Sequence, residues 1–146
     1  MEADEILVDN GKRTMTLNDL ARSQPGMDRM MAEIAERARR LYYAATLGNW
    51  PAAGYFCRTL AKHLRESAFS RPKYAEAMAT FLDVDYAPVR DAVAAKDAAA
   101  FATAWEGLVE RVNHWHGEFG MGYLVYRTPD TPPPDLDLRP REPREG

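Results

Sequence analysis

Cysteine is almost absent from the chain, since Cys57 is the only one among 146 residues. A single thiol excludes an intrachain disulfide, and small secreted folds commonly depend on disulfides for their stability. The first residues are acidic and have neither the basic segment nor the apolar segment of a signal peptide. These features predict a protein of a reducing compartment, and we expect it to be cytoplasmic.

Long apolar runs and an excess of basic residues are also missing. No stretch approaches the roughly 20 apolar residues that a transmembrane helix needs, so we expect no membrane partner. The formal net charge is −3, whereas a nucleic-acid-binding domain usually carries a concentrated basic patch, so we expect no nucleic-acid partner. The sequence also lacks a Ser-His-Asp order, a phosphate-binding glycine loop and a His-Glu-x-x-His motif.

Apolar residues at helical spacing dominate what is present. Residues 27–47 carry one apolar stripe and are followed by Gly48, a residue type that commonly ends helices. The sequence Asn49-Trp50-Pro51 then begins a second helix that we expect to reach about residue 68, because proline is well tolerated in a first turn. So short a connection predicts that the two helices are antiparallel neighbours.

Two further helices follow. The third is predicted to begin near residue 72 and to break around residues 83–86, where the apolar pattern falters. Pro88 marks a new first turn, so we expect a second segment over residues 87–95. The fourth helix is predicted over residues 97–117, with an aspartate at its start as the N-cap.

These patterns predict an all-α protein, an antiparallel four-helix bundle that occupies residues 16–128. It begins with a short helix capped by Thr16 and is preceded by a flexible N-terminal arm, residues 1–15. Residues 122–126 form a short β-like run that is too isolated to build a sheet. Residues 129–146 are rich in proline and charge and predict an extended strap or a disordered tail, with the last six residues disordered.

The apolar stripe of the fourth helix ends in a histidine. At about 100° per residue, its members fall on one face of the helix, which we expect to face the core. They are Phe101, Trp105, Leu108, Val112 and His116. A histidine at the end of such a face is a candidate to hold a metal, a haem or a proton. Its interaction with the C-terminal dipole of the helix is a purely structural alternative.

A second histidine, His63, is expected on the second helix to point inward or to the edge of the core. A pair formed with His116 across the core would suit a bis-histidine haem, an acid–base pair, or a zinc site completed by Glu66 or Glu118. His114 lies about 200° around the helix from His116, so both can reach one metal only from an unwound helix end. The alternative is that His63 is simply a half-buried helix residue.

Aromatic side chains are expected near these histidines. They are predicted either to pack in the core or to line a ligand pocket. The predicted ligand-binding residues are Tyr42, Tyr43, Tyr55, Trp105, Val112 and Trp115.

Several segments resemble a family of small bacterial four-helix bundles related to cytochrome c′. They are GNWPAA after the first long helix, KDAAAFATAW at the start of the fourth, and GYLVYRTPDTPPPDLDL in the tail. The resemblance covers about residues 20–138 and rests mostly on helical patterns. It implies the bundle fold and a ligand site at the end of the fourth helix.

In haem-bearing members of that family the fourth helix ends in Cys-x-x-Cys-His, whose thiols bond the haem and whose histidine ligates the iron. Here Val112 and Trp115 stand at the two cysteine positions, and the histidine is retained as His116. Covalent c-type attachment is therefore excluded. The resemblance leaves a non-covalent haem with His116 as the axial ligand, although the large indole of Trp115 argues against the same haem pose.

Three function hypotheses remain open from the sequence. The first is a binding protein that holds a small apolar or planar molecule in a central pocket, with haem as one version. The second is a small enzyme without a covalent cofactor that uses His116 and His63 as general base and acid, because imidazole exchanges protons near neutral pH. The third is an interaction module in which two copies form a homodimer and the tail binds a partner.

Overall fold

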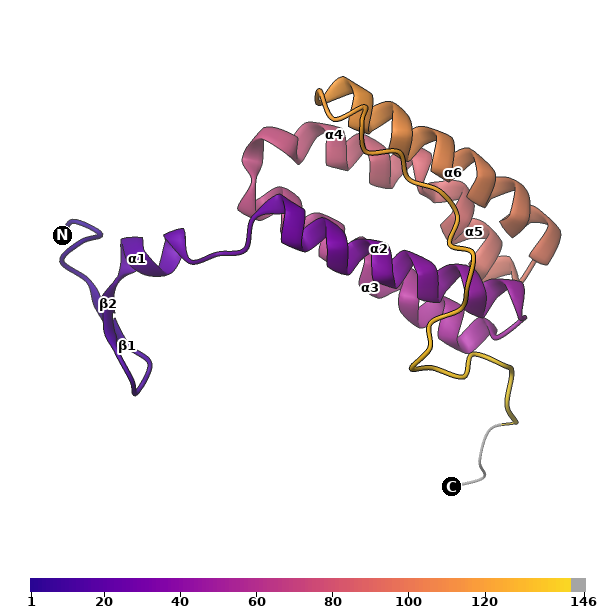
Figure 1. Cartoon of the computed structure of the whole chain (residues 1–146), viewed down its shortest axis with the longest axis horizontal. Helices are drawn as coiled ribbons and strands as arrows, with labels where there is room; N and C mark the ends of the chain where they lie inside the picture. The colour runs from indigo at the N-terminus through magenta and orange to yellow at the C-terminus, as the bar shows by residue number, and fades with distance from the viewer. Residues whose placement is uncertain (143–146) are drawn as a thin grey trace.

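The computed structural model describes residues 1–142, which are mostly helical (Figure 1). The longest elements are the three helices α2 (Met27–Thr46), α3 (Trp50–Ser70) and α6 (Ala98–Glu118). Between α3 and α6 lie the shorter elements η1 (Pro72–Tyr74), α4 (Ala75–Thr80), η2 (Phe81–Asp85) and α5 (Ala87–Ala95). The N-terminal part contains β1 (Leu7–Asp9), β2 (Thr14–Thr16) and α1 (Leu17–Arg22). None of the helices over residues 1–142 has the length and apolar character needed to cross a membrane.

The predicted helix ends are confirmed at most positions. Thr16, Asn49 and Asp97 are the N-caps of α1, α3 and α6, and each side chain accepts a hydrogen bond from the backbone N–H three residues later. Gly48 follows α2 with a φ of +76°, a left-handed conformation that glycine adopts without steric cost. The C-terminal ends differ by one or two residues, since α2 ends at Thr46, α3 at Ser70 and α6 at Glu118.

The predicted break in the third helical stretch is confirmed, and it takes the form of the π-helical turn η2. Pro88 has no backbone N–H, so the α-helical hydrogen-bond pattern cannot continue through it unchanged. The N–H of Tyr86 instead donates to the carbonyl of Phe81, five residues earlier, at 2.8 Å. The turn therefore takes in one extra residue, which changes the direction of the side chains that follow.

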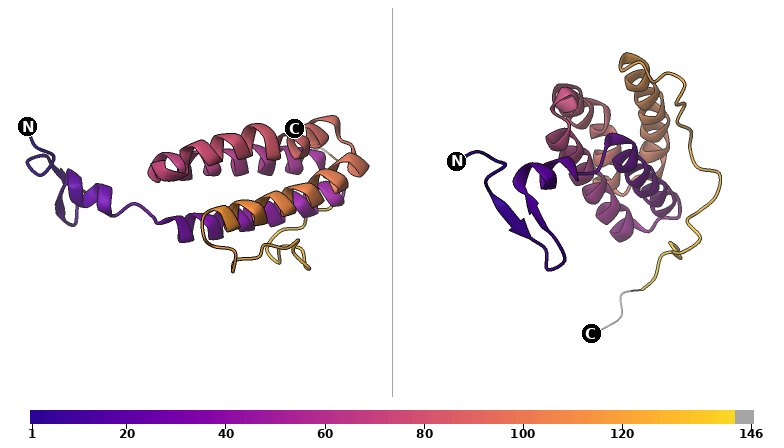
Figure 2. Two further views of the ribbon diagram at one scale, coloured as in Figure 1. Left: turned by 90° about the horizontal axis from the view of Figure 1, so that it is seen from above. Right: turned by 60° about the vertical axis from the view of Figure 1, so that its left-hand side comes forward.

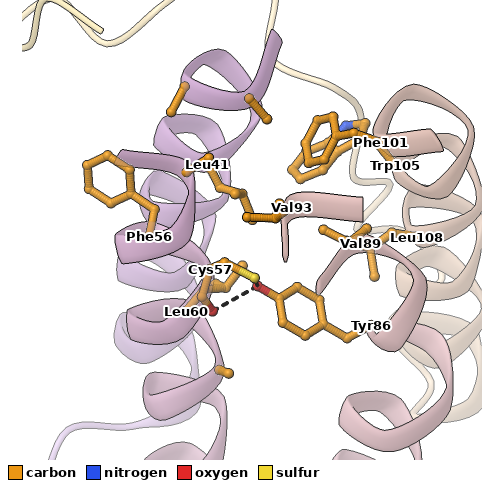
Figure 3. Packing of buried hydrophobic residues seen from close by; sticks show 14 of the residues in the cluster. Leu41, Phe56, Cys57, Leu60, Tyr86, Val89, Val93, Phe101, Trp105 and Leu108 are labelled. Atoms are coloured by element: carbon orange, nitrogen blue, oxygen red, sulfur yellow. Dashed lines mark hydrogen bonds between the residues drawn. The ribbon is translucent and has the colours of Figure 1, made fainter. Parts of the chain in front are cut away.

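The helices surround one core, with α2 against α3 and α6, and with α4 and α5 between α3 and α6 (Figure 2). Buried apolar side chains from α2, α3, α5 and α6 face one another in this core (Figure 3). Its buried apolar side chains include Leu41, Ala45, Ala53, Val93 and Phe101. Small and large residues alternate here, and this lets the helices approach closely.

The N-terminal arm contains a β-hairpin that the sequence analysis missed. Strands β1 and β2 are antiparallel, with Leu7 opposite Thr16, and the hairpin projects away from the helices (Figure 1). Residues 10–13 form its turn, in which Gly11 has a φ of +80° and the Asn10 side chain accepts from the backbone N–H groups of Lys12 and Arg13. A loop of four residues that contains glycine, between two short β-prone runs, is a hairpin signal that the sequence contains.

Residues 121–142, here called the C-terminal segment, are extended along the body. The predicted β-like run 122–126 forms no strand in the described chain and instead lies against α6. The segment then reaches α2, where the Tyr43 hydroxyl donates to the Pro129 carbonyl at 2.9 Å and Arg39 donates to the Pro132 carbonyl at 2.7 Å. Residues 129–138 of the predicted tail thus contact the body as far as Leu138, whose carbonyl accepts from the Asn49 side chain, whereas residues 143–146 of the predicted disordered end lie outside the described residues.

Leu138 provides a test of how strongly this part of the tail is held, because its side chain is only 6% exposed. We expect Leu138→Ala to lower the free energy of unfolding by about 2 kcal/mol, since burial of a leucine side chain contributes this much. Leu136, two residues earlier and 38% exposed, is the matched control, and Leu136→Ala is expected to cost less than about 0.5 kcal/mol. Chemical denaturation measures both, and equal values would contradict the described packing.

Candidate functional site

A pocket of about 620 Å³, open to solvent on one side and here called the cavity, lies beside the core. Residues of α2, α3, α4, η2, α6 and the C-terminal segment line it. Ligand pockets in proteins commonly have volumes of about 300–1,000 Å³. The wall is mainly apolar and includes the flexible methionines Met27, Met31, Met78 and Met121.

His116 lies in the wall of this cavity, on the last turn of α6, as the apolar stripe predicted. Its ring is half-buried, and its Nδ1 lies 2.6 Å from the carbonyl oxygen of Leu124. A carbonyl can only accept a hydrogen bond, so Nδ1 carries the proton and donates it. In the neutral ring Nε2 is then unprotonated, free to accept a hydrogen bond or to ligate a metal.

The two tryptophans of the wall use their polar atoms elsewhere. The indole N–H of Trp115 donates to Asp85 Oδ2 at 2.7 Å, and the other oxygen of this carboxylate accepts from Arg111 Nε at 2.9 Å. The Asp85 side chain is only 7% exposed, so the π-helical turn places a buried carboxylate behind the indole. Trp105 donates its N–H to the Thr128 hydroxyl at 3.0 Å. Both indoles therefore contribute apolar ring surface to the cavity.

Tyr86, another residue of the wall, is also satisfied within the protein. Its hydroxyl donates to the backbone carbonyl of Cys57 at 2.9 Å and lies 3.1 Å from the Cys57 sulfur (Figure 3). Burial raises the pKa of the Tyr86 phenol and of the Cys57 thiol. Cys57 therefore remains a protonated thiol at neutral pH, which makes it a poor nucleophile.

Tyr126 is held over the cavity by Asn113 on α6. The Asn113 side chain accepts from the Tyr126 N–H at 2.7 Å and donates to the Tyr126 carbonyl at 2.9 Å. The phenol hydroxyl is closed off from solvent and has no hydrogen-bond partner within residues 1–142. Burial raises the pKa of Tyr126 to about 12. The segment thus contains one buried polar atom that the fold leaves unsatisfied.

The structure does not bring the two predicted histidines together. His63 lines a separate pocket with Glu66, Gln24 and Met30, and its Nδ1 lies 2.9 Å from the Thr59 carbonyl of its own helix. The predicted pair with His116 is therefore not formed, and the alternative of a half-buried helix residue describes His63. Across the described part of the chain, no three His, Cys, Asp or Glu side chains gather closely enough to hold a metal ion. This argues against the zinc site considered with Glu66 or Glu118.

Three of the predicted ligand-binding residues line the cavity, namely Trp105, Val112 and Trp115. The three tyrosines do not. Tyr42 packs against Tyr43 and Trp105 with ring centroids 5.1 Å apart in both pairs, and Tyr43 binds the C-terminal segment. Tyr55 is 55% exposed on the outside of α3. Tyr42 and Tyr43 therefore serve packing, and Tyr55 lies on the surface. The prediction failed for them because helical spacing alone does not determine which neighbour a residue beside the apolar stripe contacts.

The sequence analysis missed Asp85, Asn113 and Leu124, which position the residues of the wall. Asp85 lies in the stretch where the apolar pattern falters, and a polar residue at a helix break is a recognisable signal. Leu124 acts through its backbone carbonyl, so its side chain carries no information about this contact.

We expect Tyr126→Phe to raise the free energy of unfolding by about 1 kcal/mol, since it removes a buried hydroxyl without a partner. The wild-type protein should also lose stability as the pH rises above about 10, where the unfolded phenol ionises but the folded one does not. Tyr126→Phe should reduce that loss. Tyr123, 78% exposed in the same segment, provides the control Tyr123→Phe, for which urea denaturation at neutral and alkaline pH should show neither effect.

Comparison of the chain with models of protein families, with curated proteins and with solved structures gives no match. The cavity and the residues of its wall are therefore the features from which a function can be inferred.

Proposed function

We propose that the protein is a cytochrome-c′-like antiparallel four-helix bundle that binds a small apolar or planar molecule in its cavity. The observation that carries this proposal is the cavity of about 620 Å³, apolar and with His116 in its wall. Ligand sites in proteins are typically concave and mainly apolar, with a few polar groups in the wall. This cavity has those properties, and His116 supplies a polar group.

The composition of the wall supports the same function. Aromatic rings offer flat surfaces to a planar ligand, and Trp105 and Trp115 are held in fixed orientations by hydrogen bonds to Thr128 and Asp85. Methionine side chains are flexible and adapt to ligands of different shape. Fixed rings on α6 and adaptable thioethers on α2 and α4 together suit a ligand that is recognised mainly by its apolar surface.

Location and assembly follow the expectations from the sequence. We propose a cytoplasmic protein whose partner is the small molecule, with no nucleic-acid or membrane partner. A homodimer stays a prediction, for which the projecting hairpin is the most suitable element. The hairpin and α1 contain no buried residue, and an isolated two-stranded hairpin is only marginally stable.

A direct test is to fill part of the cavity with a larger side chain and to measure the binding of pyrene, a planar apolar probe. Ala77 on α4 lines the cavity, so Ala77→Leu should weaken pyrene binding by tenfold or more in a titration of tryptophan fluorescence. Ala79 is exposed on the same helix and does not line the cavity, so Ala79→Leu should bind as the wild type does. No binding of pyrene by the wild type, or equal binding by both variants, would contradict the proposal.

Non-covalent haem is the narrower version of this proposal. The donation from Nδ1 of His116 to Leu124 fits it, because ligating histidines usually donate their other N–H to a carbonyl or carboxylate. The haem would supply an iron centre, and His116 would be its axial ligand through Nε2. The wall fits the two haem carboxylates less well, since Asp28 is its one Asp or Glu and neither Lys nor Arg occurs among its described residues.

Hemin titration tests this version. If it is right, hemin produces a Soret band with one equivalent bound, and His116→Ala shifts and weakens this band because the axial ligand is lost. His63→Ala is the control, since His63 lies in a different pocket, and it should leave the band unchanged. If the spectrum of hemin with the wild-type protein equals that of free hemin, the protein does not bind haem. The broader proposal of an apolar or planar ligand is then unaffected.

The enzyme hypothesis receives less support. His116 faces a cavity and has a free Nε2, which is what a general base needs. Its proposed partner His63 lies in another pocket, so an acid–base mechanism would need a different second group. For this reason we place binding ahead of catalysis.

A further inference from the structure

The charges around the cavity restrict which ligands it can accept. Asp28, in the first turn of α2, is the one acidic side chain in the wall, and the described wall contains no lysine or arginine. A carboxylate or phosphate that enters an apolar space loses its hydration and needs a cation to replace it. Here the wall supplies no cation, and the exposed carboxylate of Asp28 adds negative charge at the edge of the cavity. The wall therefore disfavours anionic ligands.

The hydrogen-bonding groups add a second restriction. The N–H groups of Trp105 and Trp115 and the hydroxyl of Tyr86 all donate to protein atoms, and the Tyr126 hydroxyl is closed off from solvent. Nε2 of His116 differs from these groups, because it is an acceptor and no described residue donates to it. Its acceptor character follows from the proton that Nδ1 shares with the Leu124 carbonyl.

We infer that the ligand is an uncharged planar molecule whose hydroxyl or N–H group donates a hydrogen bond to Nε2 of His116. The inference rests on the binding function proposed above and names the chemical class of the ligand. A molecule that carries only acceptors would leave Nε2 buried without a partner, which is unfavourable. A phenol or a neutral N–H heterocycle, by contrast, satisfies both the charge and the polarity of the wall.

The test compares probes that share one ring system and differ in one group. They are 1-hydroxypyrene, its methyl ether 1-methoxypyrene, and pyrene-1-carboxylate, each titrated into the full-length protein at pH 7 with tryptophan fluorescence as the readout. We expect the hydroxyl probe to bind about threefold to tenfold more tightly than the ether, the effect of one hydrogen bond. The carboxylate should bind at least about tenfold more weakly than the hydroxyl probe.

Three variants assign these differences to residues. His116→Phe keeps an aromatic ring but removes the acceptor, so the two neutral probes should bind equally well. His63→Phe makes the same change outside the cavity and should keep the wild-type preference. Asp28→Asn removes the negative charge and should reduce the difference in affinity between the carboxylate probe and the hydroxyl probe. Each preference is a ratio within one variant, so a general loss of stability affects both probes alike.

The outcomes separate this inference from the function on which it rests. Equal binding of the hydroxyl and ether probes by the wild type, or tightest binding of the carboxylate, would overturn the inference and leave the binding function intact. Failure of every probe to bind would overturn both. The wild-type comparison decides the question even if His116→Phe does not fold.

Discussion

Side chains of α6 hold the C-terminal segment in place, and the cavity depends on this contact. The segment has no strand partner, so its backbone groups must find partners among side chains or water. His116 binds the Leu124 carbonyl, Asn113 binds both backbone groups of Tyr126, and Trp105 binds the Thr128 hydroxyl. These three residues lie along one face of α6 and fix residues 124–128 beside it. Without them the cavity would lose part of its wall.

The π-helical turn supports the same wall from behind. The extra residue in η2 places Asp85 between α5 and α6, where its buried carboxylate accepts from both Trp115 and Arg111. The Arg111 guanidinium offsets the charge of Asp85, so the indole is oriented by a satisfied ion pair. A regular α-helix through Pro88 would direct this carboxylate differently. The irregular turn and the orientation of the wall are therefore linked.

The sequence predicted the helices well because caps and apolar spacing are local properties. Thr16 and Asp97 cap as predicted, and His116 lies in the wall of the cavity. The cavity could not be predicted, because a pattern shows which face is buried and does not show whether neighbouring side chains fill the space. The sequence also could not decide whether His63 meets His116, since a residue at the edge of an apolar stripe can face either of two neighbours.

The single imidazole of His116 joins the cavity to the C-terminal segment. When Nε2 accepts a hydrogen bond, the ring becomes a stronger donor at Nδ1, because hydrogen bonds in a chain polarise one another. A ligand of the class inferred above would thereby strengthen the contact with Leu124. Such coupling is reciprocal, so an ordered tail favours the filled state as much as filling favours an ordered tail. Binding of such a ligand and attachment of the C-terminal segment would therefore be coupled through the two nitrogens of one imidazole ring.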